Sequence, residues 1–280
     1  MSGVRRFHFA RDVEEALSLL AAYAGRGALL AGGVDLFRSP RPSIEGLIDI
    51  TRIGLSYTRE VRGGVVIGAT TTLTALQESG VGQEYVGGVL RDLLSQVAVR
   101  PLRNMATIGG ALVSAHPWAD IPTALVALGA EAHWRGEKEG KALVEDLYRG
   151  EFRGLFRRAV LTEVVLPPWD GTFAHEKVGR AQHDIALLNA CCGLGIEDGT
   201  IRWARIAVGA RPERGERLPW AEDALVGQVP RESLWKEVRR LVEERIEVGD
   251  DRRASGAWRR AVAGALVGRA LARAVRRVAP

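Results

Sequence analysis

Two double-glycine segments are the strongest candidates for chemistry in this sequence. The first, AGGVD at residues 31–35, directly follows an apolar run, and the second, TIGGA at 107–111, lies in a stretch punctuated by glycine and proline. Adjacent glycines let backbone amides approach a phosphate without a Cβ in the way, and successive amides form a concavity that binds anions. Neither segment matches the dinucleotide fingerprint G-x-G-x-x-G or the P-loop. The two segments therefore indicate either ordinary turns or a backbone cradle for a diphosphate outside those two classes.

The side chains offer little catalytic chemistry of their own. The five histidines are scattered without metal-binding spacing, and no nucleophile signature such as G-x-S-x-G is present. His116 stands beside Trp118 and Asp120, but a structural or exposed histidine is the simpler interpretation. Cys191 and Cys192 fall in an apparent strand, where neighbouring side chains point to opposite faces and cannot share a metal. We predict no catalytic side chain and no metal site, so a bound cofactor would have to supply the chemistry.

The predicted elements around these segments change from mixed helices and strands to long strands and then to helices along the chain. The pattern predicts a helix at 12–24 capped by Asp12, then strands at 28–33, 46–50 and 65–69 with a turn at Gly63-Gly64, and helices at 71–79 and 84–99. The stretch 100–125 reads as irregular because glycine and proline interrupt it. Long strands are expected at 173–180, 185–199 and 200–210, the last two joined by an Asp198-Gly199 turn, and helices follow from about 219. The linker-like PPWDG at 167–171 predicts two domains, 1–170 and 171–280.

Composition excludes several classes of protein. The chain has 280 residues, of which 46% are hydrophobic and 26% charged, which is typical of globular domains rather than disordered chains. Its longest apolar runs reach about a dozen residues, short of the ~20 that a transmembrane helix needs. We see no secretory signal and no disulfide framework, and we expect a cytoplasmic protein.

The positive charge is concentrated at one end. Residues 252–280 contain eight arginines and no acidic residue, and the rest of the chain has 31 basic against 34 acidic residues. A helical wheel places apolar and basic residues on opposite faces: Val267, Leu271, Val275 and Val278 against Arg269, Arg273 and Arg276. We favour a packed terminal helix with a solvated arginine face, and the alternative is a docking surface for an acidic partner. Without interleaved aromatic residues, we predict no nucleic-acid binding.

Taken together, the motifs resemble the FAD-binding medium subunit of molybdenum hydroxylases, the carbon monoxide dehydrogenase and xanthine dehydrogenase family. In the first half the resemblance lies in LLAGGVDL at 29–36, the stretch 103–131 and LTEVVLPP at 161–168. In the second half it lies at 176–194, 201–210 and 254–274, which resemble the family's C-terminal flavoprotein domain in the same order. The resemblance covers nearly the whole chain.

This resemblance implies an α+β fold of the vanillyl-alcohol-oxidase (PCMH) type, with two α/β subdomains and a C-terminal α+β flavoprotein domain. It implies that 29–36 wraps the FAD diphosphate and that 107–111 completes the cradle, with Val97 and Leu161 beside the ring system. Asp120 matches a carboxylate that contacts the cofactor, and Lys177 matches a basic contact from the second domain. The full set of implied contacts is Leu29, Leu30, Ala31, Gly32, Gly33, Val34, Asp35, Leu36, Val97, Thr107, Ile108, Gly109, Gly110, Ala111, Asp120, Leu161 and Lys177.

The function implied is that of an FAD-carrying electron-transfer subunit. It would accept electrons from a small 2Fe-2S partner subunit and pass them to an external acceptor, while a large partner subunit holds the molybdenum cofactor. The surface around Trp118 is the partner contact that we favour over the basic helix. Val34, Ala111, Ser114 and His116 depart from the family pattern. The alternatives are a stand-alone flavin oxidase or dehydrogenase of the same fold, and an assembly scaffold that has lost FAD.

Overall fold

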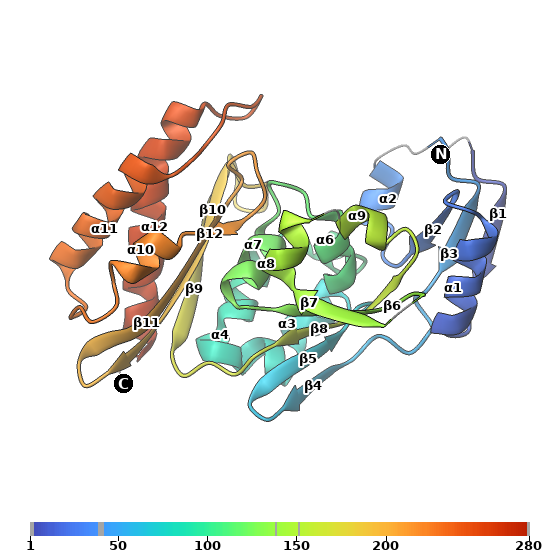
Figure 1. Cartoon of the computed structure of the whole chain (residues 1–280), viewed down its shortest axis with the longest axis horizontal. Helices are drawn as coiled ribbons and strands as arrows, with labels where there is room; N and C mark the ends of the chain where they lie inside the picture. Colours follow the sequence, from blue (N-terminus) through green and yellow to red (C-terminus); the bar gives the residue numbers. More distant parts are fainter. Residues whose placement is uncertain (1–2, 39–41, 138, 151, 279–280) are drawn as a thin grey trace. The chain divides into compact units, whose positions relative to one another are not determined.

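The computed structural model describes residues 3–38, 42–137, 139–150 and 152–278, which form two compact units (Figure 1). Unit 1 consists of Met1–Ser79, Val99–Ser114 and Ala130–Leu166. Unit 2 consists of Gly80–Ala98, Ala115–Gly129 and Pro167–Pro280. The two units therefore alternate along the chain.

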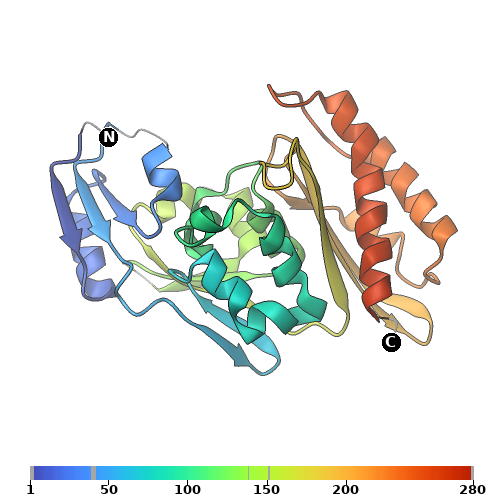
Figure 2. The ribbon, with the colours of Figure 1, turned by 180° about the vertical axis from the view of Figure 1, so that it is seen from behind.

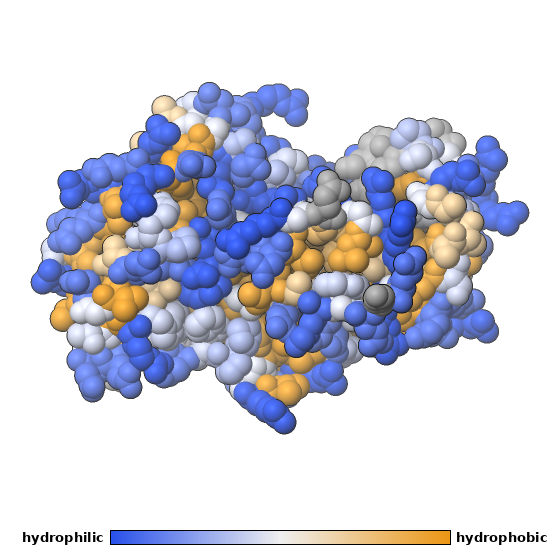
Figure 3. Space-filling view, viewed as in Figure 1, coloured by the Kyte–Doolittle hydropathy of each residue, from blue (hydrophilic) through white to orange (hydrophobic). Residues whose placement is uncertain are grey.

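Unit 1 begins with a parallel three-stranded sheet, in the order β1 (Arg6–Phe9), β3 (Gly46–Asp49) and β2 (Gly27–Leu30). The helix α1 (Val13–Ala22) packs on it and starts at the predicted cap, where the side chain of Asp12 accepts the amide of Glu15 at 2.7 Å. Apolar side chains remain at the surface over the outer strand β1 (Figure 3), where Phe7 and Phe9 are 47% and 63% exposed.

A five-stranded antiparallel sheet forms the rest of the unit 1 framework. Its order is β4 (Thr58–Val61), β5 (Gly64–Gly68), β8 (Val160–Leu166), β6 (Glu131–Arg135) and β7 (Gly140–Leu143). The β4–β5 turn is Arg62-Gly63, with φ values of 51° and 76°, so it lies one residue before the predicted turn. The helices of unit 1 after α1 are short: α2 (Val34–Arg38), α3 (Leu73–Glu78), α5 (Arg100–Arg103), α6 (Ile108–Ser114), α8 (Val144–Arg149) and α9 (Phe152–Leu155).

Unit 2 is an antiparallel sheet with helices on both faces. Its order is β12 (Glu216–Arg217), β11 (Thr200–Gly209), β10 (Leu188–Glu197) and β9 (Thr172–Val178). Its helices are α4 (Gly80–Gln96), α7 (Asp120–Ala127), α10 (Pro219–Asp223), α11 (Glu232–Arg245) and α12 (Gly256–Val278). The predicted hairpin turn between β10 and β11 is confirmed, with φ values of 49° at Asp198 and 76° at Gly199.

The long strand β10 divides its side chains between two environments. Leu188, Ala190, Cys192 and Leu194 alternate along it and join the core under α11 and α12, which lie along this sheet (Figure 2). The intervening side chains, including Asn189 and Cys191, face the side on which α7 packs. Burial raises the pKa of the Cys191 thiol to about 12, which fits the prediction that the cysteines fill core space.

The prediction that 100–125 is irregular is wrong, because α5, α6 and most of α7 lie there. Pro101 and Pro122 stand in the first turns of α5 and α7, where an amide has no intrahelical partner and proline is tolerated. The predicted helix 84–99 is also displaced. The helix observed there, α4, spans Gly80–Gln96 instead of 84–99. The backbone angles of Tyr85–Gly88 are not helical, so these residues interrupt it.

The arginine-rich helix α12 is part of the core of unit 2. Val267 and Leu271 are fully buried, as the helical wheel predicts, and the side chain of Val278 lies outside the described part of the chain. Arg273 is not merely solvated, because it pairs with Asp92 and Glu176 at 3.1 Å each. Within the described residues, no helix has both the length and the apolar character to cross a membrane.

Candidate functional site

The two glycine segments meet in unit 1. The strand β2 ends at Leu30 and delivers Gly32 to the backbone that precedes α6. A Cβ on Gly32 would lie only 1.7 Å from the carbonyl oxygen of Met105, so this close approach requires glycine. The structure therefore brings residues 31–35 against the segment that leads into 107–111.

The amides of the two segments differ in what they can still bind. Within the described chain, the amides of Gly32 and Gly33 donate no hydrogen bond. The amide of Gly109 already donates to Ala69 at 2.9 Å, and that of Gly110 donates to the side-chain oxygen of Thr107 at 3.1 Å. Among these four glycines, the amides of Gly32 and Gly33 are therefore the two that have no partner in the described chain and can bind an anion.

The glycines of α6 also differ in the space around them. A Cβ on Gly109 would lie 2.6 Å from the carbonyl oxygen of Ala69, whereas a Cβ on Gly110 would meet a single neighbour, Thr107 Oγ1, at 2.9 Å. Gly109 is thus needed by the fold itself. Gly110 faces open space, and with the two free amides this space fits the diphosphate of the FAD implied by the sequence.

Unit 2 contains a buried polar cluster centred on Asp120, the first residue of α7. The ammonium of Lys177 lies 3.2 Å from Asp120 Oδ2 and also donates to the carbonyl oxygens of Gln96 at 2.7 Å and Asp184 at 2.9 Å. Asn189 donates its amide to Asp120 Oδ1 at 2.8 Å. The two predicted contacts Asp120 and Lys177, separated by 57 residues, therefore form an ion pair.

Burial alone would raise the pKa of Asp120, but its neighbours outweigh that effect and lower the pKa. The neighbours responsible are His175, whose Nε2 lies 3.6 Å from Oδ1, and then Lys177 and Asn189. His175 is completely buried, and neither ring nitrogen has a hydrogen-bond partner among the described residues. The neighbours of Asp120 therefore favour its ionised form although the residue is only 6% exposed.

His175 and Asn189 belong to this cluster but are not among the site residues predicted from the sequence. The signal for His175 is strand alternation, which places it on the same face of β9 as Lys177. The signal for Asn189 is a polar residue inside an apolar run, and in the sheet it pairs directly with Lys177. Both follow from the period of a strand once the strand is assigned.

The remaining predicted contacts are divided between the units. Leu161 lies in β8 of unit 1 and is 5% exposed, whereas Val97 follows α4 in unit 2 and is half-buried. Unit 1 thus holds 29–36, 107–111 and Leu161, and unit 2 holds Val97, Asp120 and Lys177. Their joint role around one cofactor stays a prediction.

Two of the departures from the family pattern have defined surroundings in the structure. Ser114 donates its hydroxyl hydrogen to the carbonyl oxygen of Gly110 within α6. His116 stacks on Trp118 with ring centroids 4.7 Å apart, and the guanidinium of Arg253 lies 4.1 Å from the centroid of the same indole ring. His116 and Arg253, both in unit 2, thus contact the indole ring of Trp118.

Comparison with known families gives two matches. Residues 3–169 match the FAD binding domain in molybdopterin dehydrogenase, and residues 173–274 match the CO dehydrogenase flavoprotein C-terminal domain. Together they account for nearly all of the described chain.

Individual relatives match along almost their entire length. The chain is 29% identical to caffeine dehydrogenase subunit beta of Pseudomonas sp. (strain CBB1), over 95% of this chain and 93% of that protein. It is also 29% identical to the carbon monoxide dehydrogenase medium chain of Hydrogenophaga pseudoflava, over 95% of each.

Solved structures show the same likeness. Carbon monoxide dehydrogenase from Hydrogenophaga pseudoflava lacking the Mo-pyranopterin moiety matches with a TM-score of 0.90 and 28% identity, over 98% of each chain. Quinoline 2-oxidoreductase from Pseudomonas putida 86 matches with a TM-score of 0.89 and 27% identity, over 97% of this chain and 96% of that one.

Proposed function

The chain belongs to the family of FAD-binding medium subunits of molybdenum hydroxylases, and from that premise we propose that it is the electron-exit subunit of such a complex. It is an oxidoreductase subunit with a mixed α/β fold, and FAD is its cofactor. Bound FAD would supply the redox chemistry of this role, which is the transfer of electrons from a 2Fe-2S partner subunit to an external acceptor. The chain's own residues bind, orient and tune this group.

One observation carries the proposal. The first double-glycine segment contacts the backbone of Met105, two residues before the second segment. The amides of Gly32 and Gly33 donate no hydrogen bond within the described chain, and Gly110 faces open space. Paired amides without Cβ atoms bind a diphosphate through main-chain donors, so the loss of the threonine or histidine that the family often has at Val34 leaves these contacts intact. We propose that unit 1 holds the diphosphate here.

The cluster of unit 2 would act on the charge of the cofactor. Lys177 is held by Asp120 and two carbonyl oxygens, so its ammonium is fixed in position rather than free to rotate into solvent. A fixed cation favours a nearby anion, and we propose that Lys177 stabilises negative charge gained by the flavin. Asp120 would be a positioning residue that orients the ammonium of Lys177.

The partners are proposed from the relatives, which include medium chains of multi-subunit dehydrogenases. We propose a small 2Fe-2S subunit and a large molybdenum-binding subunit. The contact with the iron–sulfur subunit around Trp118 stays a prediction, as do the domain boundary at 170/171 and a cytoplasmic location.

The diphosphate site is tested with Gly110→Val. A Cβ at this position would meet only the Thr107 hydroxyl, which can shift, so we expect the variant to fold. The branched side chain would occupy the space proposed for the diphosphate, and we expect FAD retention to be abolished. The measurement is the flavin absorbance per chain after purification, with the fold checked by circular dichroism.

Gly154→Val is the matched control, because Gly154 also lies in a short helix of unit 1 and a Cβ added to it would have no atom within 4 Å. The control should keep its FAD. A folded Gly110→Val variant with a full complement of flavin would show that the TIGG segment does not hold the diphosphate.

A further inference from the structure

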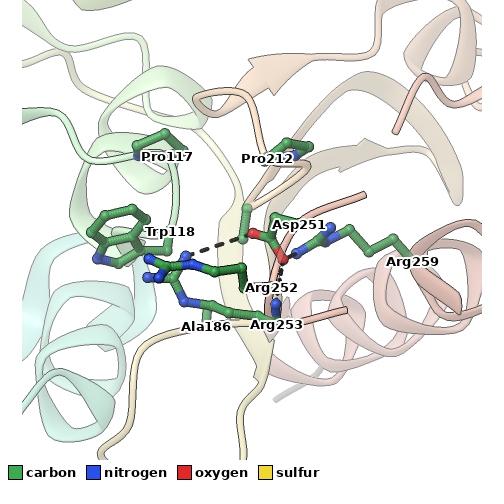
Figure 4. A pocket seen from close by; sticks show the side chains of 9 residues that line it. Pro117, Trp118, Ala186, Pro212, Asp251, Arg252, Arg253 and Arg259 are labelled. Carbon is green, nitrogen blue, oxygen red and sulfur yellow. Dashed lines mark hydrogen bonds and ion pairs between the residues drawn. The ribbon is translucent and has the colours of Figure 1, made fainter. Parts of the chain in front are cut away.

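Unit 2 contains a cavity of about 340 Å³ that none of the predicted cofactor contacts lines. In Figure 4, Pro117 and Trp118 lie on one side of the cavity and Pro212 lies on the other side near Asp251, while Arg252 and Arg253 come from the loop that precedes α12. A volume of this size accommodates a small organic molecule. The cavity combines apolar side chains with cationic ones.

An ion pair between the buried Arg259 and Asp251 lines part of this cavity. Arg259 is 1% exposed and donates to the carbonyl oxygens of Leu187, Gly249 and Ala254 at 3.1, 2.7 and 2.9 Å. It also donates to Asp251 Oδ1 at 2.7 Å (Figure 4). The charge of Arg259 is therefore committed to holding the loop and α12 together.

Asp251 is the only carboxylate among the described lining residues, and it is committed as well. Its Oδ1 accepts Arg259 and the amides of Arg253 and Ala254, at 2.8 and 3.1 Å for the two amides. Burial opposes ionisation of Asp251, but these hydrogen bonds outweigh it and lower the pKa to about 2. One negative charge thus balances one of three lining arginines.

The two remaining arginines leave the cavity with surplus positive charge. The guanidinium of Arg253 lies 4.1 Å from the ring centroid of Trp118. Its distance to Asp251 Oδ2 is 3.6 Å, which is long for an ion pair. Stacking on an indole fixes the orientation of the guanidinium while leaving its edge N–H groups free to donate. Arg252 is exposed and forms no hydrogen bond or ion pair with the described chain.

We propose that this cavity binds a small organic anion. Its carboxylate or phosphate group is held by Arg252 and Arg253, and its apolar body lies against Pro117, Pro212 and the edge of Trp118, because His116 and Arg253 cover the faces of the indole ring. Guanidinium groups bind both kinds of oxyanion in a planar, two-point geometry, which explains why an oriented arginine stands beside apolar side chains. The site includes none of the predicted cofactor contacts, but it shares Trp118 with the surface that we predict contacts the iron–sulfur subunit.

The test uses the full chain loaded with FAD and three probes of similar shape: benzoate, phenyl phosphate and the neutral benzyl alcohol. Isothermal titration calorimetry should detect binding of at least one anion and at least tenfold weaker binding of the alcohol, since a charge-assisted hydrogen bond contributes about 1.5–3 kcal/mol. Binding of only one anion assigns the charged group as carboxylate or phosphate.

Arg252→Gln and Arg253→Gln should each weaken anion binding about tenfold. Arg252 is exposed and unpaired, so its variant tests the site even where Arg253→Gln disturbs the loop. Arg260→Gln is the matched control, because Arg260 is an exposed arginine of α12 outside the cavity, and it should bind as the unmodified chain does.

Three results would overturn the proposal. The first is equal binding of the alcohol and the anions, and the second is unchanged anion binding in both arginine variants. The third is anion binding by the FAD-free chain that disappears when FAD is loaded, since the cavity would then belong to the cofactor site. None of these results would bear on Gly110 and the diphosphate.

Discussion

Asp120→Asn removes the single negative charge of the buried cluster in unit 2. The side chains of Asp120 and Lys177 are 6% and 5% exposed, so solvent cannot replace the lost partner. Removing one member of a buried ion pair costs about 3–5 kcal/mol of unfolding free energy. Lys177 keeps the carbonyl oxygens of Gln96 and Asp184. We therefore expect a loss at the low end, about 3 kcal/mol.

A double-mutant cycle separates the ion pair from general damage to the core. Lys177→Met alone leaves the Asp120 carboxylate buried with Asn189 as its remaining donor, and it should also be destabilising. The double variant Asp120→Asn/Lys177→Met carries no buried charge at this pair, so its loss should fall short of the sum by about 2 kcal/mol, within the range measured for contacting residues.

The assay is urea unfolding of the FAD-free chain at neutral pH, followed by far-ultraviolet circular dichroism. Asp223→Asn, at an exposed position in α10 of the same unit, is the control and should change the unfolding free energy by less than about 0.5 kcal/mol. The reasoning is refuted when Asp120→Asn behaves like this control or when the cycle shows additivity.

Two further predictions concern pH and the arginine helix. The pKa values of Asp120 and Asp251 are lower in the folded chain than in the unfolded chain, so both carboxylates stabilise the fold above about pH 4 and lose this effect as the pH falls. For Asp251, whose pKa is about 2, the loss extends to about pH 2. An acid titration should show stability falling steeply across that window and less steeply in Asp251→Asn; identical slopes would contradict this. Arg269→Glu/Arg276→Glu should leave the fold and co-purification with the iron–sulfur subunit unchanged, because both side chains are exposed; loss of the partner would identify α12 as its docking surface.

Local signals in the sequence were sufficient for elements that depend on neighbouring residues. Asp12 caps α1, and Asp198-Gly199 forms the hairpin turn, because caps and tight turns are determined by a few adjacent side chains. Residues 100–125 were mispredicted because proline in a first turn and proline as a breaker look alike until the start of each helix is known.

The site shows the same division. The two glycine segments and the pair Asp120 and Lys177 were identifiable by resemblance, but their contacts join residues 57 and more apart in sequence, and no local pattern determines such distances. His175 and Asn189 became recognisable only with the register of β9 and β10. The role of Arg259 was also hidden, because a buried arginine and a solvated one have the same sequence signal.

The alternation of the two units along the chain has a consequence for biosynthesis. Asp92 of α4 pairs with Arg277, which follows it by 185 residues, and with Arg273 of the same terminal helix. When α4 leaves the ribosome, the residues that complete its surroundings have not been made. We expect unit 2 to fold only after α12 has been synthesised, with α4 exposed until then, so a chain that stops before α12 would lose the fold of the whole unit rather than one helix.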